Sequence, residues 1–122
     1  MPQETRNLIG KTGIRFGLTL GDREECAQRL CRGLETYGAT NHLRPEFDVI
    51  QEALEELYDA FNQVAVIGPR RAREAAHGRL PERDLVFGDS ERWIAACQHI
   101  AFGIRILHQL RQEQTAPPDE DL

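Results

Sequence analysis

The sequence predicts an all-α protein, a helical bundle of three main helices, and three observations support this prediction. Apolar residues in two long segments recur at alternating spacings of four and three, the period of a buried helix face. Capping residues and glycines mark the ends of these segments. No apolar run approaches the roughly 20 residues that cross a bilayer, so we expect no membrane-spanning helix.

Length, charge and cysteine content exclude several classes of protein. At 122 residues the chain has the size of one domain. Its formal net charge of −5 argues against a protein that coats duplex nucleic acid. The amino terminus lacks the basic start and apolar core of a signal peptide, and an odd number of cysteines indicates reduced thiols. We therefore expect a cytoplasmic protein.

The amino-terminal arm, residues 1–21, has no helical period. Apolar residues alternate with polar or small ones at Ile14, Phe16, Leu18 and Leu20. This alternation favours an irregular or strand-like arm, and disorder of the first ten residues fits equally well.

The helical bundle domain is predicted to span residues 22–113. Asp22, with Glu25 three residues later, has the form of a helix cap, so a first helix should begin at about Arg23. Gly38 is well placed to end this helix in a left-handed conformation.

The second helix is predicted over about residues 45–67. Pro45 suits its first turn, and Gly68 with Pro69 should stop it. Its apolar stripe is the strongest pattern in the chain and consists of Ile50, Leu54, Leu57, Phe61 and Val64.

A mobile basic connection is expected to follow, with at most a short helix around residues 70–77. A third helix should run over about 91–113, starting after Gly88, Asp89 and Ser90. Its apolar positions repeat at four and three and are Trp93, Cys97, Ile100, Ile104 and Leu107. Residues 114–122 are predicted to form a disordered acidic tail.

Three helices with stripes this long leave apolar surface uncovered. A two-fold dimer would complete a bundle of four or more helices, so we expect a homo-oligomer. An antiparallel four-helix pair and a domain-swapped dimer fit the pattern equally.

Four carboxylates lie on the side of the second helix opposite its apolar stripe. They are Glu52, Glu55, Glu56 and Asp59. Mg²⁺ prefers oxygen ligands, and helical spacing projects such residues to one side, so this face is the predicted place for metal chemistry. A solvated helix face is the plain alternative, because glutamate and leucine are good helix formers.

The segment EELYDAFNQVAVI resembles the second metal-binding helix of the MazG-like all-α nucleoside triphosphate pyrophosphohydrolases. The stretches RLCRGLETYG and EALEELYDA also resemble small helical bacteriophage proteins. The resemblance implies Mg²⁺ and hydrolysis of a nucleotide to its monophosphate and pyrophosphate. Glu56 and Asp59 match the family's E-x-x-D pair, whereas Cys31 and Arg32 stand where the preceding helix should carry two acids.

The candidate site that follows has three parts. The metal ligands would be Glu52, Glu56 and Asp59, with Glu35 as a fourth, and Glu55 would act as the base toward water. Three arginines after the acidic helix would bind phosphate, because guanidinium groups make bidentate contacts with such anions. They are Arg70, Arg71 and Arg73.

The leading hypothesis is thus a Mg²⁺-dependent nucleotide-binding protein, phage-like or bacterial, which would be a pyrophosphohydrolase if active. The competing hypothesis is a non-enzymatic helical protein that captures a protein partner or an anionic nucleotide, for example a phage counter-defence protein. A purely structural dimerisation module is the third. Histidine and cysteine spacings do not form a zinc motif.

Overall fold

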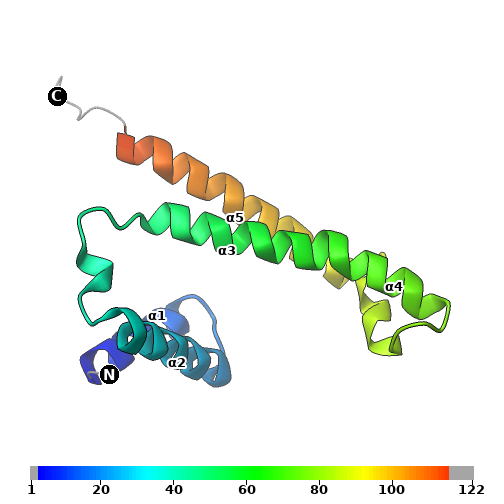
Figure 1. Ribbon diagram of the computed structural model, residues 1–122, viewed down its shortest axis with the longest axis horizontal. Coiled ribbons are helices and arrows are strands. Elements are labelled where there is room, and N and C mark those ends of the chain that lie inside the picture. Colours follow the sequence, from blue (N-terminus) through cyan, green and yellow to red (C-terminus); the bar gives the residue numbers. More distant parts are fainter. Residues whose placement is uncertain (1–2, 116–122) are drawn as a thin grey trace. The chain divides into compact units, whose positions relative to one another are not determined.

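The computed structural model describes residues 3–115, and in this range the chain forms helices and no strand (Figure 1). The all-α prediction is confirmed, although the described chain contains five α-helices instead of three main ones. The chain divides into two compact units, one up to Phe47 and one from Asp48 onward. Each unit is described by itself.

The first unit is built from α1 (Gln3–Arg15) and α2 (Leu20–Tyr37), which pack against each other. Gly13 is buried where the two helices meet. A Cβ atom at this position would collide with the side-chain carbons of Arg23. The absence of a side chain at Gly13 leaves room for the Arg23 side chain, whose Nη1 donates to the Leu18 carbonyl at 2.8 Å.

The strand-like arm predicted for residues 1–21 is wrong, because α1 occupies most of it. Gly17 adopts φ +83° and ends the helix, with the Leu18 N–H donating to the Gly13 carbonyl at 2.8 Å. The hydroxyl of Thr19 then accepts from the Asp22 N–H at 3.1 Å and caps α2. The apolar alternation therefore spans the end of one helix, a short turn and the start of the next.

The end predicted for the first of the three helices is confirmed, and its start is wrong by one turn. Thr19, not Asp22, is the cap, so α2 begins at Leu20. Gly38 has φ +95° and donates its N–H to the Leu34 carbonyl at 2.9 Å. A short 3₁₀ turn, η1 (Asn41–Leu43), follows.

The second unit begins with α3 (Val49–Phe61), which is capped by Asp48 and not started by Pro45. The Asp48 carboxylate accepts from the Gln51 N–H at 3.0 Å. Helical structure continues through the π-helical segment η2 (Asn62–Ile67) into α4 (Gly68–Ala76), as Figure 1 shows.

Gly68 and Pro69 do not end this helix, contrary to the sequence prediction. In η2 the hydrogen-bond ladder widens, and the Gly68 N–H bonds to the carbonyl of Gln63, five residues back. Pro69 therefore lies in the first turn of α4, where a missing N–H is tolerated.

The rest of the unit consists of η3 (Glu82–Phe87), which packs on α4, and α5 (Glu91–Thr115), which packs along α3. The Ser90 hydroxyl accepts from the Trp93 N–H at 3.1 Å, so the predicted start of this helix is confirmed. The helix includes the first two residues of the predicted 114–122 tail, and the others lie outside the described residues.

The core of the second unit is small. Ile50 and Leu54 are buried on α3, and Ala72 and Ala75 are buried on α4. From Glu91 to Gln114, α5 has only half-buried or exposed residues.

Candidate functional site

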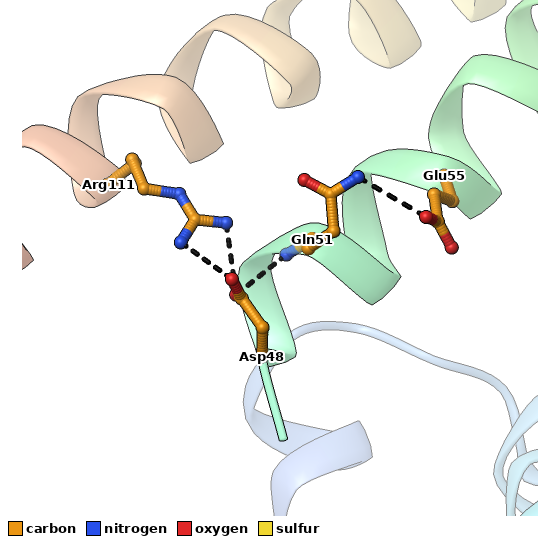
Figure 2. A network of polar contacts seen from close by, with 4 residues as sticks. All are labelled: Asp48, Gln51, Glu55 and Arg111. Atoms are coloured by element: carbon orange, nitrogen blue, oxygen red, sulfur yellow. Dashed lines mark hydrogen bonds and ion pairs between the residues drawn. The ribbon is translucent and has the colours of Figure 1, made fainter. Parts of the chain in front are cut away.

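The predicted acidic face lies on α3 and is fully exposed. Glu52, Glu55, Glu56 and Asp59 all point away from the buried stripe of this helix. Glu55 accepts a hydrogen bond from the Gln51 side chain at 3.2 Å, one turn away (Figure 2). Within residues 3–115, no group of three His, Cys, Asp or Glu side chains is arranged to hold a metal ion.

Glu35, the predicted fourth metal ligand, lies on α2 in the first unit and is exposed. Its carboxylate accepts from the thiol of Cys31 at 3.4 Å. The acids of α3 thus lie together on one helix of the second unit, and Glu35 lies on a helix of the first unit.

The three predicted phosphate-binding arginines lie on α4, so the short helix expected around residues 70–77 is confirmed and the mobile connection is wrong at these positions. Arg71 is partly exposed and forms an ion pair with Asp84 of η3, whose carboxylate is 3.0 Å from Nη2 and 3.2 Å from Nε. Asp84 is buried, with 7% of its surface exposed. Arg71 thus holds η3 against α4.

Arg70 and Arg73 are different, because both are exposed and neither has a hydrogen bond or ion pair in the described part of the chain. Their spacing of three, followed by His77 four residues later, places all three side chains on one face of the helix. We call Arg70, Arg73 and His77 the arginine stripe.

A small hollow of about 210 Å³ borders the stripe. It is lined by Ile67, Arg70, Arg71, Glu74 and Leu80. The carboxylate of Glu74 is the one negative group in this lining, and Arg79 pairs with it at 2.7 Å. Residues 70–84 contain five arginines against three acids, so this end of the second unit is basic although the chain as a whole is acidic.

The acidic face and the arginine stripe are separated along one continuous helical run. From Asp59 to Arg70 the chain rises by about 16 Å at 1.5 Å per residue. Because helical structure continues through η2 into α4, the carboxylates of α3 stay apart from the guanidinium groups of α4.

A hydrogen bond from Trp93 supports the π-helical segment. In an α-helix the carbonyl of Val64 would accept from the Gly68 N–H, but that N–H bonds to Gln63 instead. The next candidate, Pro69, has no N–H. The indole Nε1 of Trp93 supplies the missing donor at 2.7 Å.

An open apolar hollow of about 680 Å³ lies beside this hydrogen bond. Its lining consists of Val64, Val86, Phe87, Ser90, Glu91, Arg92, Trp93 and Ala96. Phe87 also packs so closely on Gly68 that a Cβ atom there would lie 2.7 Å from the phenyl ring. Apolar surface of this extent is typical of binding sites.

In the described part of the chain, polar contacts join α3 to α5 near Asp48 and at Tyr58. The Asp48 carboxylate accepts from both terminal nitrogens of Arg111, at 2.8 and 3.0 Å (Figure 2). Arg111 and the Gln51 N–H lower the pKa of Asp48 below its ordinary value of 3.8, and the carboxylate raises the pKa of Arg111. Tyr58 and His108 share a second cross-helix hydrogen bond at 3.0 Å.

Sequence reasoning missed Trp93, Asp48 and Arg111 as connecting residues. The role of Trp93 could have been inferred from Pro69, because a proline in a helix removes an N–H donor that another group must replace. The pairing of Asp48 with Arg111 has no local signal, since 63 residues separate them.

No protein family, curated protein or solved structure matches this chain in comparisons of its sequence and fold. Among residues 3–115, none of the helices has the length and apolar character required to cross a membrane.

Proposed function

We propose that this chain is a non-enzymatic binding protein that captures a phosphate-bearing small anion of the nucleotide class. The observation that carries the proposal is the arginine stripe, in which Arg70 and Arg73 are exposed on one face of α4 without a partner in the described residues. Guanidinium groups of this kind bind phosphate oxygens by charge-assisted, often bidentate hydrogen bonds.

Neighbouring side chains hold the charged groups of the proposed site in place and give it an apolar wall. Asp84 pairs with Arg71 in the lining of the hollow, and Arg79 compensates the charge of Glu74, the carboxylate in that lining. Ile67 and Leu80 give the hollow an apolar wall, against which the flat face of a base or sugar can rest.

The magnesium-dependent pyrophosphohydrolase stays a prediction based on the sequence resemblance. Its acids lie on an exposed face, and about 16 Å of helix rise separates Asp59 from Arg70. Anion capture by the arginines requires neither the metal nor the acids, which is why we prefer it.

Isothermal titration with a panel of nucleoside mono-, di- and triphosphates tests the proposal. Replacing Arg70 and Arg73 together by glutamine should weaken binding at least tenfold, because each charge-assisted hydrogen bond contributes about 1.5–3 kcal/mol. The matched control replaces Arg6 and Arg32, two exposed arginines of the first unit, and lowers the charge equally. Equal weakening by both pairs would reduce the effect to net charge and contradict the site.

The same titration, repeated with Mg²⁺ and followed by chromatography of the nucleotide, separates capture from hydrolysis. We expect the nucleotide to be recovered intact, and the variant Glu56→Gln with Asp59→Asn to bind as the natural chain does. Recovery of monophosphate and pyrophosphate, lost in that variant, would establish the hydrolase instead.

We also propose that the chain acts as a homodimer. In this dimer the packed helices α3 and α5 of one copy join the same two helices of a second copy to form a four-helix bundle. The absence of any buried residue between Glu91 and Gln114 supports this proposal, because a 25-residue helix stabilised by so little packing needs further cover. Light scattering of the natural chain tests the proposal, and a monomer would overturn it.

A further inference from the structure

A turn joins α1 to α2 at one end of the first unit (Figure 1). Every residue from Ile14 to Asp22 is exposed to solvent. The exposed fraction is 65% for Ile14, 70% for Phe16, 39% for Leu18 and 63% for Leu20. We call these four residues the apolar turn. Exposed apolar side chains that gather at one place are typical of an interaction surface.

Cations accompany the apolar turn along the chain. Between Glu4 and Asp22 the sequence carries Arg6, Lys11 and Arg15 and no acidic residue. Lys11 and Arg15 are both exposed, and their spacing of four places them on one face of α1. This end of the first unit is therefore basic, although the chain as a whole has a net charge of −5.

One of these cations lies directly on an aromatic ring of the apolar turn. The guanidinium carbon of Arg15 is 4.9 Å from the ring centroid of Phe16. Such a pair is attractive, and it presents positive charge and apolar surface side by side. An arginine of this kind can keep its charged end in a polar layer while the neighbouring ring enters an apolar one.

The backbone of the turn is hydrogen-bonded within the first unit. The N–H groups of Phe16, Gly17 and Leu18 donate to carbonyls of α1, at 3.1, 3.2 and 2.8 Å. The Leu18 carbonyl accepts from Nη1 of Arg23 at 2.8 Å. A backbone group that enters hydrocarbon without a partner is costly. These groups can leave water without that cost, because they already have partners.

A bilayer with anionic lipids combines the two chemistries that this surface requires. Lipid phosphates carry negative charge at the membrane surface, and the acyl chains begin just below them. An acidic soluble partner would neutralise Lys11 and Arg15, but it would also have to supply an apolar pocket for Phe16. Charge complementarity together with the apolar side chains therefore favours the bilayer.

We infer that the apolar turn docks on a membrane surface that carries anionic lipids. Phe16 and its apolar neighbours enter the boundary of the acyl chains, and Lys11 and Arg15 contact lipid phosphates. The contact is made at the surface of the bilayer by the first unit. It is independent of anion capture at the arginine stripe, which belongs to the second unit.

Co-sedimentation of the full chain with lipid vesicles tests this docking. The chain should bind vesicles of phosphatidylcholine mixed with phosphatidylglycerol, and it should bind pure phosphatidylcholine more weakly. Added NaCl should release it, because salt screens exposed charges. Equal binding to both compositions would overturn the role of anionic lipids. Absence of binding to the mixed vesicles would overturn the inference and favour an acidic protein as the partner.

Replacing Lys11 and Arg15 together by glutamine tests the cations. Binding to the mixed vesicles should weaken by at least about tenfold, because each cation near an anionic surface contributes about fivefold. The matched control replaces Arg29 and Arg32, two exposed arginines farther along α2, and lowers the charge equally. Equal weakening by both pairs would reduce the effect to net charge and overturn docking at the turn.

Replacing Ile14 and Phe16 together by glutamine tests the apolar side chains. Both are exposed, so circular dichroism should show the natural helix content, and binding should weaken by at least about tenfold. The matched control is Tyr37→Gln with Leu43→Gln, which removes side chains that are 72% and 78% exposed at and beyond the other end of α2. This control should bind as the natural chain does, and an equal loss would overturn the assignment to the turn.

The variant Arg70→Gln with Arg73→Gln separates this inference from the proposed function. It should bind the mixed vesicles as the natural chain does, even though its nucleotide binding is lost. A loss of vesicle binding greater than that of the Lys11 and Arg15 variant would mean that the arginine stripe contacts the lipid and would overturn docking at the turn.

Fluorescence measures whether the turn enters the bilayer. The natural chain has a single tryptophan, Trp93 in the second unit, so it serves as the reference for Phe16→Trp. Lipids with brominated acyl chains should quench the added fluorescence of Phe16→Trp. Quenching no greater than that of the natural chain would overturn insertion of the apolar turn.

Discussion

The guanidinium of Arg111 donates to both carboxylate oxygens of Asp48, at 2.8 and 3.0 Å, and joins the start of α3 to the last turns of α5. The same carboxylate caps α3 through the Gln51 N–H. One side chain therefore fixes a helix start and holds it against a neighbouring helix.

The stability of the second unit should decrease in acid because of Asp48. The pKa of Asp48 is lowered in the folded chain, so its contribution is fully present above 3.8 and is lost as the pH falls through the folded pKa. Thermal unfolding of Asp48→Asn should give a lower Tm than the natural chain at pH 7, and the two values should converge in acid. The control Glu56→Gln, on the exposed face and beyond the first turn of α3, should follow the natural chain, and a Tm gap for Asp48→Asn that persists in acid would contradict this role.

Replacing Gly68 by alanine should destabilise the contact between α4 and η3. The added methyl group would lie 2.7 Å from the ring of Phe87, and overpacking of this kind costs about 1–3 kcal/mol. The control is Gly33→Ala in α2, where no atom outside the helix backbone lies within 4 Å and the higher helix propensity of alanine should stabilise by up to about 1 kcal/mol. Urea unfolding measures both, and equal effects would exclude the steric explanation.

The Trp93 indole should matter mainly as a hydrogen-bond donor to Val64. Trp93→Phe leaves the Val64 carbonyl without this donor, which should cost about 1–3 kcal/mol of unfolding free energy. In a Pro69→Ala background the backbone N–H at position 69 becomes available to that carbonyl, so the same substitution should cost less. Equal costs in the two backgrounds, measured as a double-mutant cycle, would show that packing and not the hydrogen bond dominates.

Local signals in the sequence predicted the helices better than their junctions. The stripe through Leu54 and the serine at position 90 identified α3 and α5, because periodicity and capping act within a few residues. The segment around Gly17 was misread, because apolar residues on both sides of a short turn imitate the alternation of a strand. Pro69 was misread because only the widened ladder before it allows the helix to continue.

The sequence predicted which residues make up the candidate site, but it did not predict how their side chains are arranged in space. The sequence identified the three arginines of α4, but the engagement of Arg71 by Asp84 depends on how η3 folds back. The magnesium ligands remain a prediction, because an acidic helix face has the same sequence whether it is solvated or covered by a partner.

The widened ladder of η2 also sets the rotational phase of the chain. Ala72 and Ala75 would continue the stripe of Leu54 and Phe61 in an uninterrupted α-helix and so face α5, whereas the structure turns them toward η3. The segment behaves as a one-residue insertion, equivalent to a rotation of about 100°. Loss of a single residue between Asn62 and Ile67 would reset this phase and turn the buried alanines of α4 by about 100° relative to α3.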